Sequence, residues 1–433
     1  MLQRHESDEA LVDRLQSAAF SYFLDRCNPD NGLIADTSID GAPCSIAATG
    51  FGLSSYPVAV ERGWMRREDA VARTLAALRF FVGSQQSRDK EATGYRGFYY
   101  HFLDMTTGRR TWNCELSTID SALLIAGILT AAAYFSGDSD DEREIGALAD
   151  RLYHRVDWHW ALNKGPTLSM GWRPGGRFIP YRWQGYSEAI LMYVLALASP
   201  AHAVPESSYH AFTAGYDWQT IDGRRVLYAG PLFVHLFSHA WIDFRGIRDA
   251  CIAAHGSDYI DNTRRAIDIQ RAYTGRNPGK FVGYSDDIWG LTACDGPGPA
   301  NGTGARRGTK FLGYAARGAP FGPDDGTLAP WAPLACLPFA PEAALAGTRA
   351  LLLAYPDLFQ DGRFPGSFNP SFPNGQGQGW VDDRCVGLDH GLLVMMIENH
   401  RSGLIWELMR RVPAIRTGLE RAGFSGGWID APQ

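Results

Sequence analysis

The sequence predicts an all-α fold, an (α/α)6 barrel with long cleft-lining loops and a few short hairpins. Apolar residues recur at helical spacing in about twelve segments. No linker or change of composition divides the 433-residue chain before a Gly/Pro-rich tract at residues 295–325. About twelve helices without a division fit six antiparallel pairs closed into a double-layered ring, and we expect a single domain over residues 1–433.

The expected helices have recognisable ends. Ser117 opens Ser-Thr-Ile-Asp before the apolar stretch 122–135, and Ser187-Glu188 opens a segment that ends at Ser199-Pro200. Residues 94–110 and 224–228 are mixed in character and predict short hairpins. Helical periodicity resumes after the tract at 295–325, so we expect that tract to be a functional loop over the cleft. In order, the predicted helices cover about residues 8–26, 45–62, 67–86, 118–135, 141–157, 186–199, 206–216, 231–255, 257–275, 341–356, 384–399 and 403–422.

Composition and charge exclude several classes of protein. A content of 45% hydrophobic and 12% aromatic residues excludes disordered and collagen-like chains. The net charge of −6 disfavours nucleic acid and anionic membrane surfaces as partners. The longest apolar stretch, residues 122–135, is shorter than the roughly 20 residues that span a bilayer. The polar N-terminus predicts a cytoplasmic protein, or a periplasmic one if a leader has been removed, and we expect a monomer.

Neither metal nor cofactor chemistry is expected. The seven cysteines are spread without a CxxC pair or zinc-like Cys/His spacing. His235 and His239 stand four residues apart, but HLFSH lacks the glutamate of HExxH, which favours core or cleft histidines. No GxSxG occurs, so a Ser–His–Asp triad has no support.

Aromatic and charged residues cluster at 172–188, WRPGGRFIPYRWQGYSE. Such a composition suits sugar recognition, since pyranose C–H faces stack on aromatic rings while hydroxyl groups bond to charged side chains. Core packing is the alternative for any single ring. From this cluster and elsewhere we expect substrate contacts from Trp183, Tyr186, Arg245, His239, Asp287, Trp289 and Asp325. Asp287 and Asp325 belong to the adjacent pairs Asp286-Asp287 and Asp324-Asp325, and a third such pair is Asp382-Asp383. Neighbouring side chains on an extended chain face opposite ways, so each pair offers at most one member to a cleft.

Three carboxylates are candidates for catalysis, and each has a structural alternative. Glu188 precedes an apolar helix and could simply interact with its dipole. Asp120 completes a capping-box pattern with Ser117. Glu115 lies in irregular backbone and could be a loop salt-bridge partner. A general acid needs a raised pKa, so burial or a second carboxylate would have to outweigh the helix dipole at Glu188.

Eight runs of the chain are informative when taken together. They are SIAATGFGL (45–53), GFYYHFLD (97–104), ELSTID (115–120), GYSE (185–188), SHAWIDFRG (238–246), WGLTACDGP (289–297), DDGTLAP (324–330) and MIENHRSGLIW (396–406). These runs resemble one known family, the glycoamylase-like domain of glycoside hydrolase family 144 and of cyclic β-1,2-glucan synthases. The resemblance covers nearly the whole chain, in order. It implies an (α/α)6 barrel and endo-β-1,2-glucanase activity on linear β-1,2-glucan that yields short sophoro-oligosaccharides, without a metal.

The resemblance also implies catalytic residues. The essential carboxylate of the GYSE-like run falls on Glu188, and a second one falls on Asp120. A further acid that some members carry three residues earlier is replaced here by Ser117, with Glu115 as a substitute two residues before it. We therefore expect a glycoside hydrolase that cleaves β-1,2-glucan with a carboxylate pair. A β-1,2-glucan transglycosylase and a catalytically inert oligosaccharide-binding protein are the alternatives, and an epimerase would need paired cleft histidines.

Overall fold

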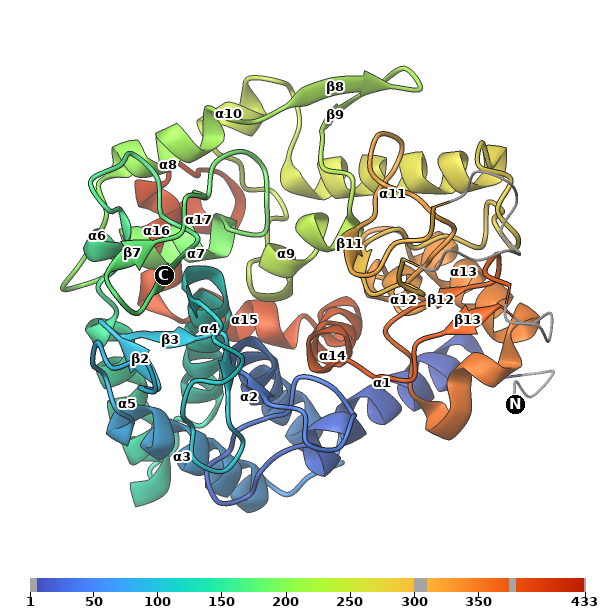
Figure 1. The fold of residues 1–433 in the computed structure, drawn as a ribbon. Helices are drawn as coiled ribbons and strands as arrows, with labels where there is room; N and C mark the ends of the chain where they lie inside the picture. The colour runs from blue at the N-terminus through green and yellow to red at the C-terminus, as the bar shows by residue number, and fades with distance from the viewer. Residues whose placement is uncertain (1–5, 300–309, 374–378, 432–433) are drawn as a thin grey trace.

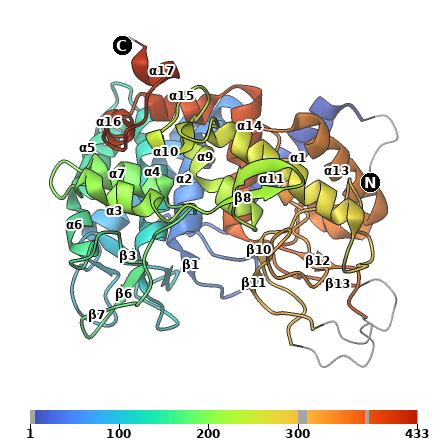
Figure 2. The ribbon, with the colours of Figure 1, turned by 90° about the horizontal axis from the view of Figure 1, so that it is seen from above.

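The structure is a computed structural model that describes residues 6–299, 310–373 and 379–431. Helices dominate it and form two concentric layers (Figures 1 and 2). The inner layer holds α2 (Ile46–Glu61), α4 (Thr118–Tyr134), α7 (Ile190–Leu197), α9 (Phe237–Trp241), α12 (Ala332–Ala335) and α14 (Gly387–Arg401). The outer layer holds α1 (Asp8–Asp25), α3 (Arg67–Gly83), α5 (Asp140–Arg155), α8 (Glu206–Thr213), α11 (Tyr259–Arg276) and α13 (Pro341–Ala354). The alternation of outer and inner helices along the chain confirms the predicted (α/α)6 architecture.

The remaining helices are short. They are α6 (Trp158–Ala161), α10 (Ala250–Ala253), α15 (Leu404–Arg410), α16 (Pro413–Arg421), α17 (Gly427–Asp430) and the 3₁₀ turns η1 (Leu232–His235) and η2 (Pro356–Gly362). The single helix expected at 231–255 is wrong: the chain forms η1, α9 and α10 instead, because Gly246 takes a left-handed φ of 74° and Asp249 caps a new helix. The helix expected at 403–422 is divided at Pro413, which begins α16.

The strands are short, and every paired strand is antiparallel to its neighbour. A hairpin forms within residues 94–110, as β2–β3. Residues 224–228 supply only the second strand of the β8–β9 hairpin, because β8 (Trp218–Ile221) lies before that stretch. One sheet has the order β2 (Gly94–Tyr95), β3 (Phe98–Tyr100), β5 (Leu116–Ser117), β6 (Gly171–Arg173), β7 (Arg177–Phe178). The two-stranded pairs are β1 (Cys44–Ser45) with β4 (Phe102–Leu103), β8 (Trp218–Ile221) with β9 (Arg224–Leu227), β10 (Ala293–Cys294) with β11 (Ala315–Ala316), and β12 (Phe368–Asn369) with β13 (Trp380–Val381).

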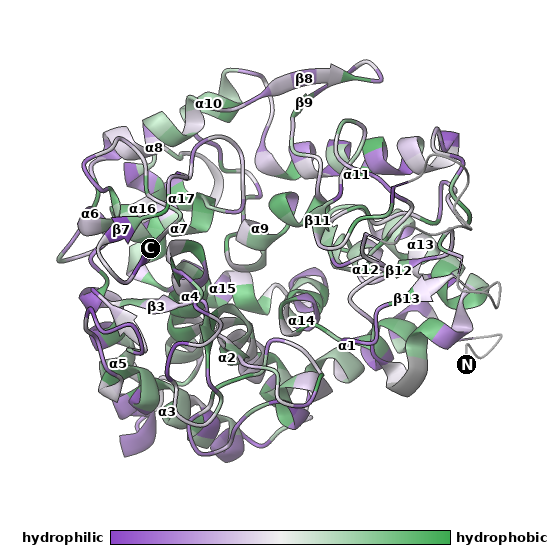
Figure 3. Ribbon diagram, viewed as in Figure 1, coloured by the Kyte–Doolittle hydropathy of each residue, from purple (hydrophilic) through white to green (hydrophobic). Residues whose placement is uncertain are grey.

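Apolar residues concentrate in the inner layer, whereas outer helices such as α5 and α11 are polar on one side (Figure 3). One buried cluster draws on residues from Leu11 to Ile429. Within it, α2 packs against α4 and α14. The crossing of α2 and α4 depends on glycine, because a Cβ atom on Gly127 would lie 2.0 Å from the carbonyl oxygen of Gly50. The two backbones therefore touch directly.

The two ends of the barrel differ. Strands β1, β6, β7, β10, β11, β12 and β13 and their loops lie at one end, and α15, α16 and α17 lie towards the other (Figure 2). Several inner helices begin at the end that carries the strands, since β1 leads directly into α2 and β5 into α4. None of the helices in the described ranges is long and apolar enough to cross a membrane.

Candidate active site

A cavity of about 540 Å³ lies among the loops that lead into the inner helices. Its apolar lining comes from the first turns and preceding loops of α4, α9, α12 and α14: Ile119, Leu123, Phe233, Phe237, Trp331 and Leu388. Its acidic lining consists of Asp36, Asp120, Glu188, Asp295, Asp382 and Asp389. The cavity thus combines apolar surface with many carboxyl groups, and Glu188 and Asp120 both belong to it as predicted.

Glu188 is held immediately before α7. Its carbonyl oxygen accepts a 2.8 Å hydrogen bond from Ser238 Oγ, which itself accepts one from the backbone N–H of Leu191. Burial, together with the negative charge of Asp120, raises the pKa of Glu188 to about 7. Burial therefore outweighs any stabilisation of the carboxylate by the helix dipole. The carboxyl group keeps its proton close to neutral pH, which a general acid requires.

Asp120 lies in the first turn of α4 and is fixed from two sides. Ser117 Oγ donates a 2.5 Å hydrogen bond to Asp120 Oδ2, and it also caps the helix by accepting from the backbone N–H of Asp120. His101 Nε2 lies 3.6 Å from the same Oδ2 atom. Asp120 therefore takes part in the cap of α4 and also lines the cavity.

His101 connects Asp120 to Glu115. Its Nδ1 atom lies 3.1 Å from Glu115 Oε1, opposite the nitrogen that faces Asp120. Burial disfavours the charged imidazolium, but Asp120, Glu115 and Asp36 outweigh it and raise the pKa of His101 to about 9. The hydrogen bond with His101 in turn lowers the pKa of Glu115 to about 2. Glu115 is absent from the cavity lining, and it contacts that lining through His101.

Arg384, Asp382 and Asp295 form a second cluster of charged residues in the cavity lining. Arg384 binds Asp382 through Nε at 2.7 Å and Asp295 through Nη2 at 3.0 Å. Burial raises the pKa of Asp36 to about 6 and holds that of Asp389, in the first turn of α14, well above its ordinary range. Several cavity carboxyl groups therefore retain protons at higher pH than exposed ones do.

The aromatic residues expected to bind substrate lie behind the cavity wall. Trp183 is buried, and its Nε1 donates a 3.0 Å hydrogen bond to Thr118 Oγ1 at the start of α4. The Tyr186 hydroxyl lies 3.3 Å from His235 Nδ1. Neither side chain lines the cavity. Both hold the loop before Glu188 against its neighbours, because indole and phenol groups buried there need polar partners.

Arg245 and Asp287 also lie outside the cavity. Arg245 pairs with Asp243 at 2.8 Å and lies over the ring of Trp406 in α15, towards the opposite end of the barrel. Asp287 is exposed and lies 3.5 Å from Arg271. Both residues take part in ion pairs that their sequence context did not reveal.

His239, Trp289 and Asp325 are buried structural residues that also lie outside the cavity lining. Burial lowers the pKa of His239 to about 3, so it is neutral, and Trp289 is fully enclosed. Asp325 forms a completely buried ion pair with Arg317, whose Nε lies 2.7 Å from Oδ1. Their burial is a tertiary property, which local composition does not report.

Sequence reasoning missed several residues of the cavity. Asp36 belongs to no motif, and the closure of the ring brings its loop against α14, where the backbone N–H of Gly387 donates to the carbonyl of Asp36. His101 lies within one of the runs that carry the family resemblance, and Asp382 lies within an acidic pair. Neither pattern indicated which of its residues would line a cavity. Of the tract at 295–325, residues 300–309 lie outside the description, but Asp295 and Tyr314 line the cavity, as expected of a cleft-lining loop. The missed residues are Asp36, His101, Asp295, Tyr314, Trp331, Asp382, Arg384 and Asp389.

Comparisons with known proteins give consistent results. The Glycoamylase family model, described as "Putative glucoamylase", matches residues 180–413, which is more than half of the chain. A curated relative, the exo β-1,2-glucooligosaccharide sophorohydrolase (non-reducing end) of Parabacteroides distasonis, is 28% identical over 451 residues. The match covers 96% of this chain but only 58% of that relative.

Solved structures extend the likeness over the full length. A crystal structure of "a putative glucoamylase" from Bacteroides uniformis has a TM-score of 0.86 and 28% identity, covering 98% of this chain and 99% of that one. The endo-β-1,2-glucanase from Chitinophaga pinensis, in complex with sophorotriose and glucose, has a TM-score of 0.82 and 25% identity, covering 97% and 99%. The chain belongs to the Glycoamylase family, which confirms the resemblance found in its sequence.

Proposed function

We propose that this chain is a glycoside hydrolase that cleaves β-1,2-linked glucan to short sophoro-oligosaccharides. The observation that carries the proposal is the presence in one cavity of Glu188, with a pKa of about 7, and Asp120, which contacts a cationic histidine. A glycosidase needs one protonated and one ionised carboxyl group. The names of the relatives, a β-1,2-glucooligosaccharide sophorohydrolase and an endo-β-1,2-glucanase, support the same linkage.

In this mechanism Glu188 donates its proton to the glycosidic oxygen as the bond to the anomeric carbon breaks. Asp120 takes a proton from the water that attacks the same carbon, so that one water is consumed for each bond cleaved. The Ser117 hydroxyl and the His101 imidazolium both contact Asp120 Oδ2 and orient this carboxyl group. Glu115 keeps His101 charged and oriented.

The remaining lining offers both kinds of contact that a sugar needs. Phe233 and the exposed Tyr314 supply rings for pyranose C–H faces, while Asp382 and Arg384 supply hydrogen-bonding groups. These residues take the substrate-binding role that the sequence suggested for Trp183 and its neighbours. The substrate class is therefore a neutral glucan or gluco-oligosaccharide.

Incubation with linear β-1,2-glucan, laminarin and cellulose, followed by chromatography of the products, tests the proposal. We expect degradation of β-1,2-glucan alone, with sophoro-oligosaccharides as products and no product from the Glu188→Gln variant. Elongated or cyclic glucans would indicate a transglycosylase instead. Binding without any product would indicate the inert sugar-binding protein.

A further inference from the structure

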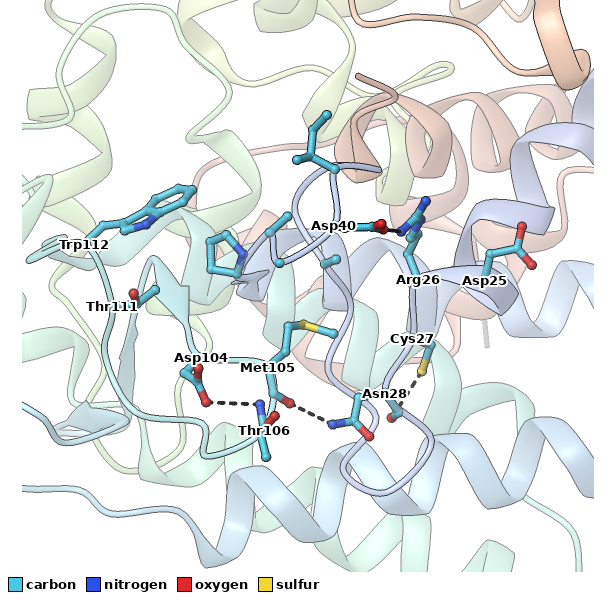
Figure 4. A pocket seen from close by; sticks show the side chains of 15 residues that line it. Asp25, Arg26, Cys27, Asn28, Asp40, Asp104, Met105, Thr106, Thr111 and Trp112 are labelled. Atoms are coloured by element: carbon cyan, nitrogen blue, oxygen red, sulfur yellow. Dashed lines mark hydrogen bonds and ion pairs between the residues drawn. The ribbon is translucent and has the colours of Figure 1, made fainter. Parts of the chain in front are cut away.

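A second hollow has a volume of about 410 Å³ (Figure 4). Three segments form it: the loop after α1 with Arg26 and Asn28, the loop at residues 39–43, and the turn at residues 104–112. Trp112 lies at one side of the hollow, and Arg26 with Asp40 lies at the other (Figure 4). None of these residues belongs to the lining of the catalytic cavity.

The hollow and the cavity share their walls. Ala35 lines the hollow, and the next residue, Asp36, lines the cavity. Phe102 lines the cavity, and its ring lies 5.0 Å from the ring of Trp112, centroid to centroid. Phe102 also stacks on His101, with the ring centroids 4.0 Å apart. A line of rings therefore leads from the acid pair to the hollow.

Trp112 is presented to solvent. Its side chain is 66% exposed, although tryptophan usually buries most of its surface. Both Trp112 and Asn113 have left-handed backbone angles, with φ of 53° and 52°, which is unfavourable for a bulky residue. Hydrogen bonds from Thr111 N–H to the carbonyl of Phe102 and from Cys114 N–H to that of Thr111 hold this turn. The turn is thus fixed with an indole ring directed outward.

Polar groups accompany the ring. Asp40 is fully exposed and is oriented by a 3.0 Å ion pair with Arg26. The carboxylate of Asp104 accepts hydrogen bonds from its own turn, and Asn28 Nδ2 donates to the carbonyl of Met105, so the walls are ordered without a ligand. An exposed indole face beside ordered carboxylate and guanidinium groups matches the C–H face and the hydroxyl groups of a pyranose.

We propose that this hollow is an accessory subsite for glucan, in which Trp112 stacks on a glucosyl ring of a chain whose reacting linkage lies in the cavity. The inference rests on the proposed function, because the wall that the hollow shares with the cavity assigns the ligand. It adds a requirement for chain length: Trp112 should add affinity only for glucan chains long enough to extend from the cavity into the hollow.

Calorimetric titration of the full chain carrying Glu188→Gln tests this subsite with a β-1,2-linked trisaccharide and with long linear β-1,2-glucan. Adding Trp112→Ala should weaken binding of the polymer about tenfold, as expected for one lost stacking contact, and leave trisaccharide binding unchanged. Trp112→Phe should restore most of the affinity. Trp218→Ala is the matched control, since Trp218 is a partly exposed tryptophan of the β8–β9 hairpin that lines neither hollow.

Unchanged polymer affinity in a folded Trp112→Ala variant overturns the subsite, as does an equal loss for both ligands or the absence of any glucan binding. Hydrolysis by the wild-type chain is measured separately. A chain that hydrolyses β-1,2-glucan while Trp112→Ala binds it normally retains its proposed function and loses only the subsite.

Discussion

The ionisation of Glu188 predicts how the rate of glucan cleavage depends on pH. The acid function is present below the pKa of about 7 and is lost as the pH rises through it. At a pH of about 8, roughly one tenth of the molecules retain the proton, and kcat/KM should fall about tenfold for each further pH unit. His101, with a pKa of about 9, stays charged over most of this range and does not cause the decline.

Unfolding linked to Glu188 cannot produce the same decline. A carboxyl group whose pKa is raised by folding binds its proton more tightly in the folded state, so the stability that it contributes is complete below the ordinary value of 4.5. That contribution is lost between 4.5 and about 7 and does not change further above that range. A fall in rate above neutral pH therefore reports on catalysis.

Initial rates of reducing-end formation on linear β-1,2-glucan, measured from a pH of about 5 to about 9, test this prediction. Circular dichroism at each pH verifies that the chain stays folded. Glu188→Gln should lower kcat/KM by about 10²–10⁴ and remove the decline centred near neutral pH. A decline centred near the ordinary glutamate pKa, or full activity in Glu188→Gln, would refute the role of this residue as the acid.

Three further predictions concern the surroundings of the site. His101→Gln should lower kcat by about 10-fold or more, because an uncharged amide cannot replace the charged contact that orients Asp120, while the melting temperature and KM should change little. Unaltered kcat would argue against a role for the His101–Asp120 contact in the reaction. Asp325→Ala should lower the free energy of unfolding in urea by about 3–5 kcal/mol, since it leaves the Arg317 guanidinium buried without its carboxylate, and a loss below about 1 kcal/mol would contradict this reasoning. Gly127→Ala should destabilise the chain by about 1–3 kcal/mol through overpacking against α2. Its control is Gly146→Ala in α5, where a Cβ meets nothing within 4 Å, and this variant should be neutral or stabilising. Equal effects of the two substitutions in thermal melts would disprove the close crossing of α2 and α4.

The helical layers could be predicted from the sequence because apolar periodicity is a local property. It identified α4 and most of α11, in which successive turns repeat the same pattern. It failed for α12, which is only four residues long, Ala332–Ala335, and contains Pro333. Such a segment forms an inner helix only through its neighbours, and no local pattern indicates this.

The residues of the cavity also fall into some that could be predicted from local sequence and others that could not. Glu188 and Asp120 could be predicted because each stands beside a helix start within a run shared with a known family. Asp36 and Asp389 could not, because their places in the cavity depend on packing between α2 and α14, segments that are distant in the sequence. Trp183 was interpreted from its composition, which cannot distinguish a ring on the cavity wall from one behind it.

The contact between Gly50 and Gly127 also bears on the rate of the reaction. Gly127 lies two helical turns along α4 from Asp120, about 10 Å at 1.5 Å per residue. A side chain at this crossing would displace α4 as a rigid body and carry Asp120 away from Glu188, which is fixed to α7 and α9. A misplacement of about 1 Å can cost about 10²-fold in rate. Two residues without a functional group would thereby determine how accurately the proposed acid and base are aligned.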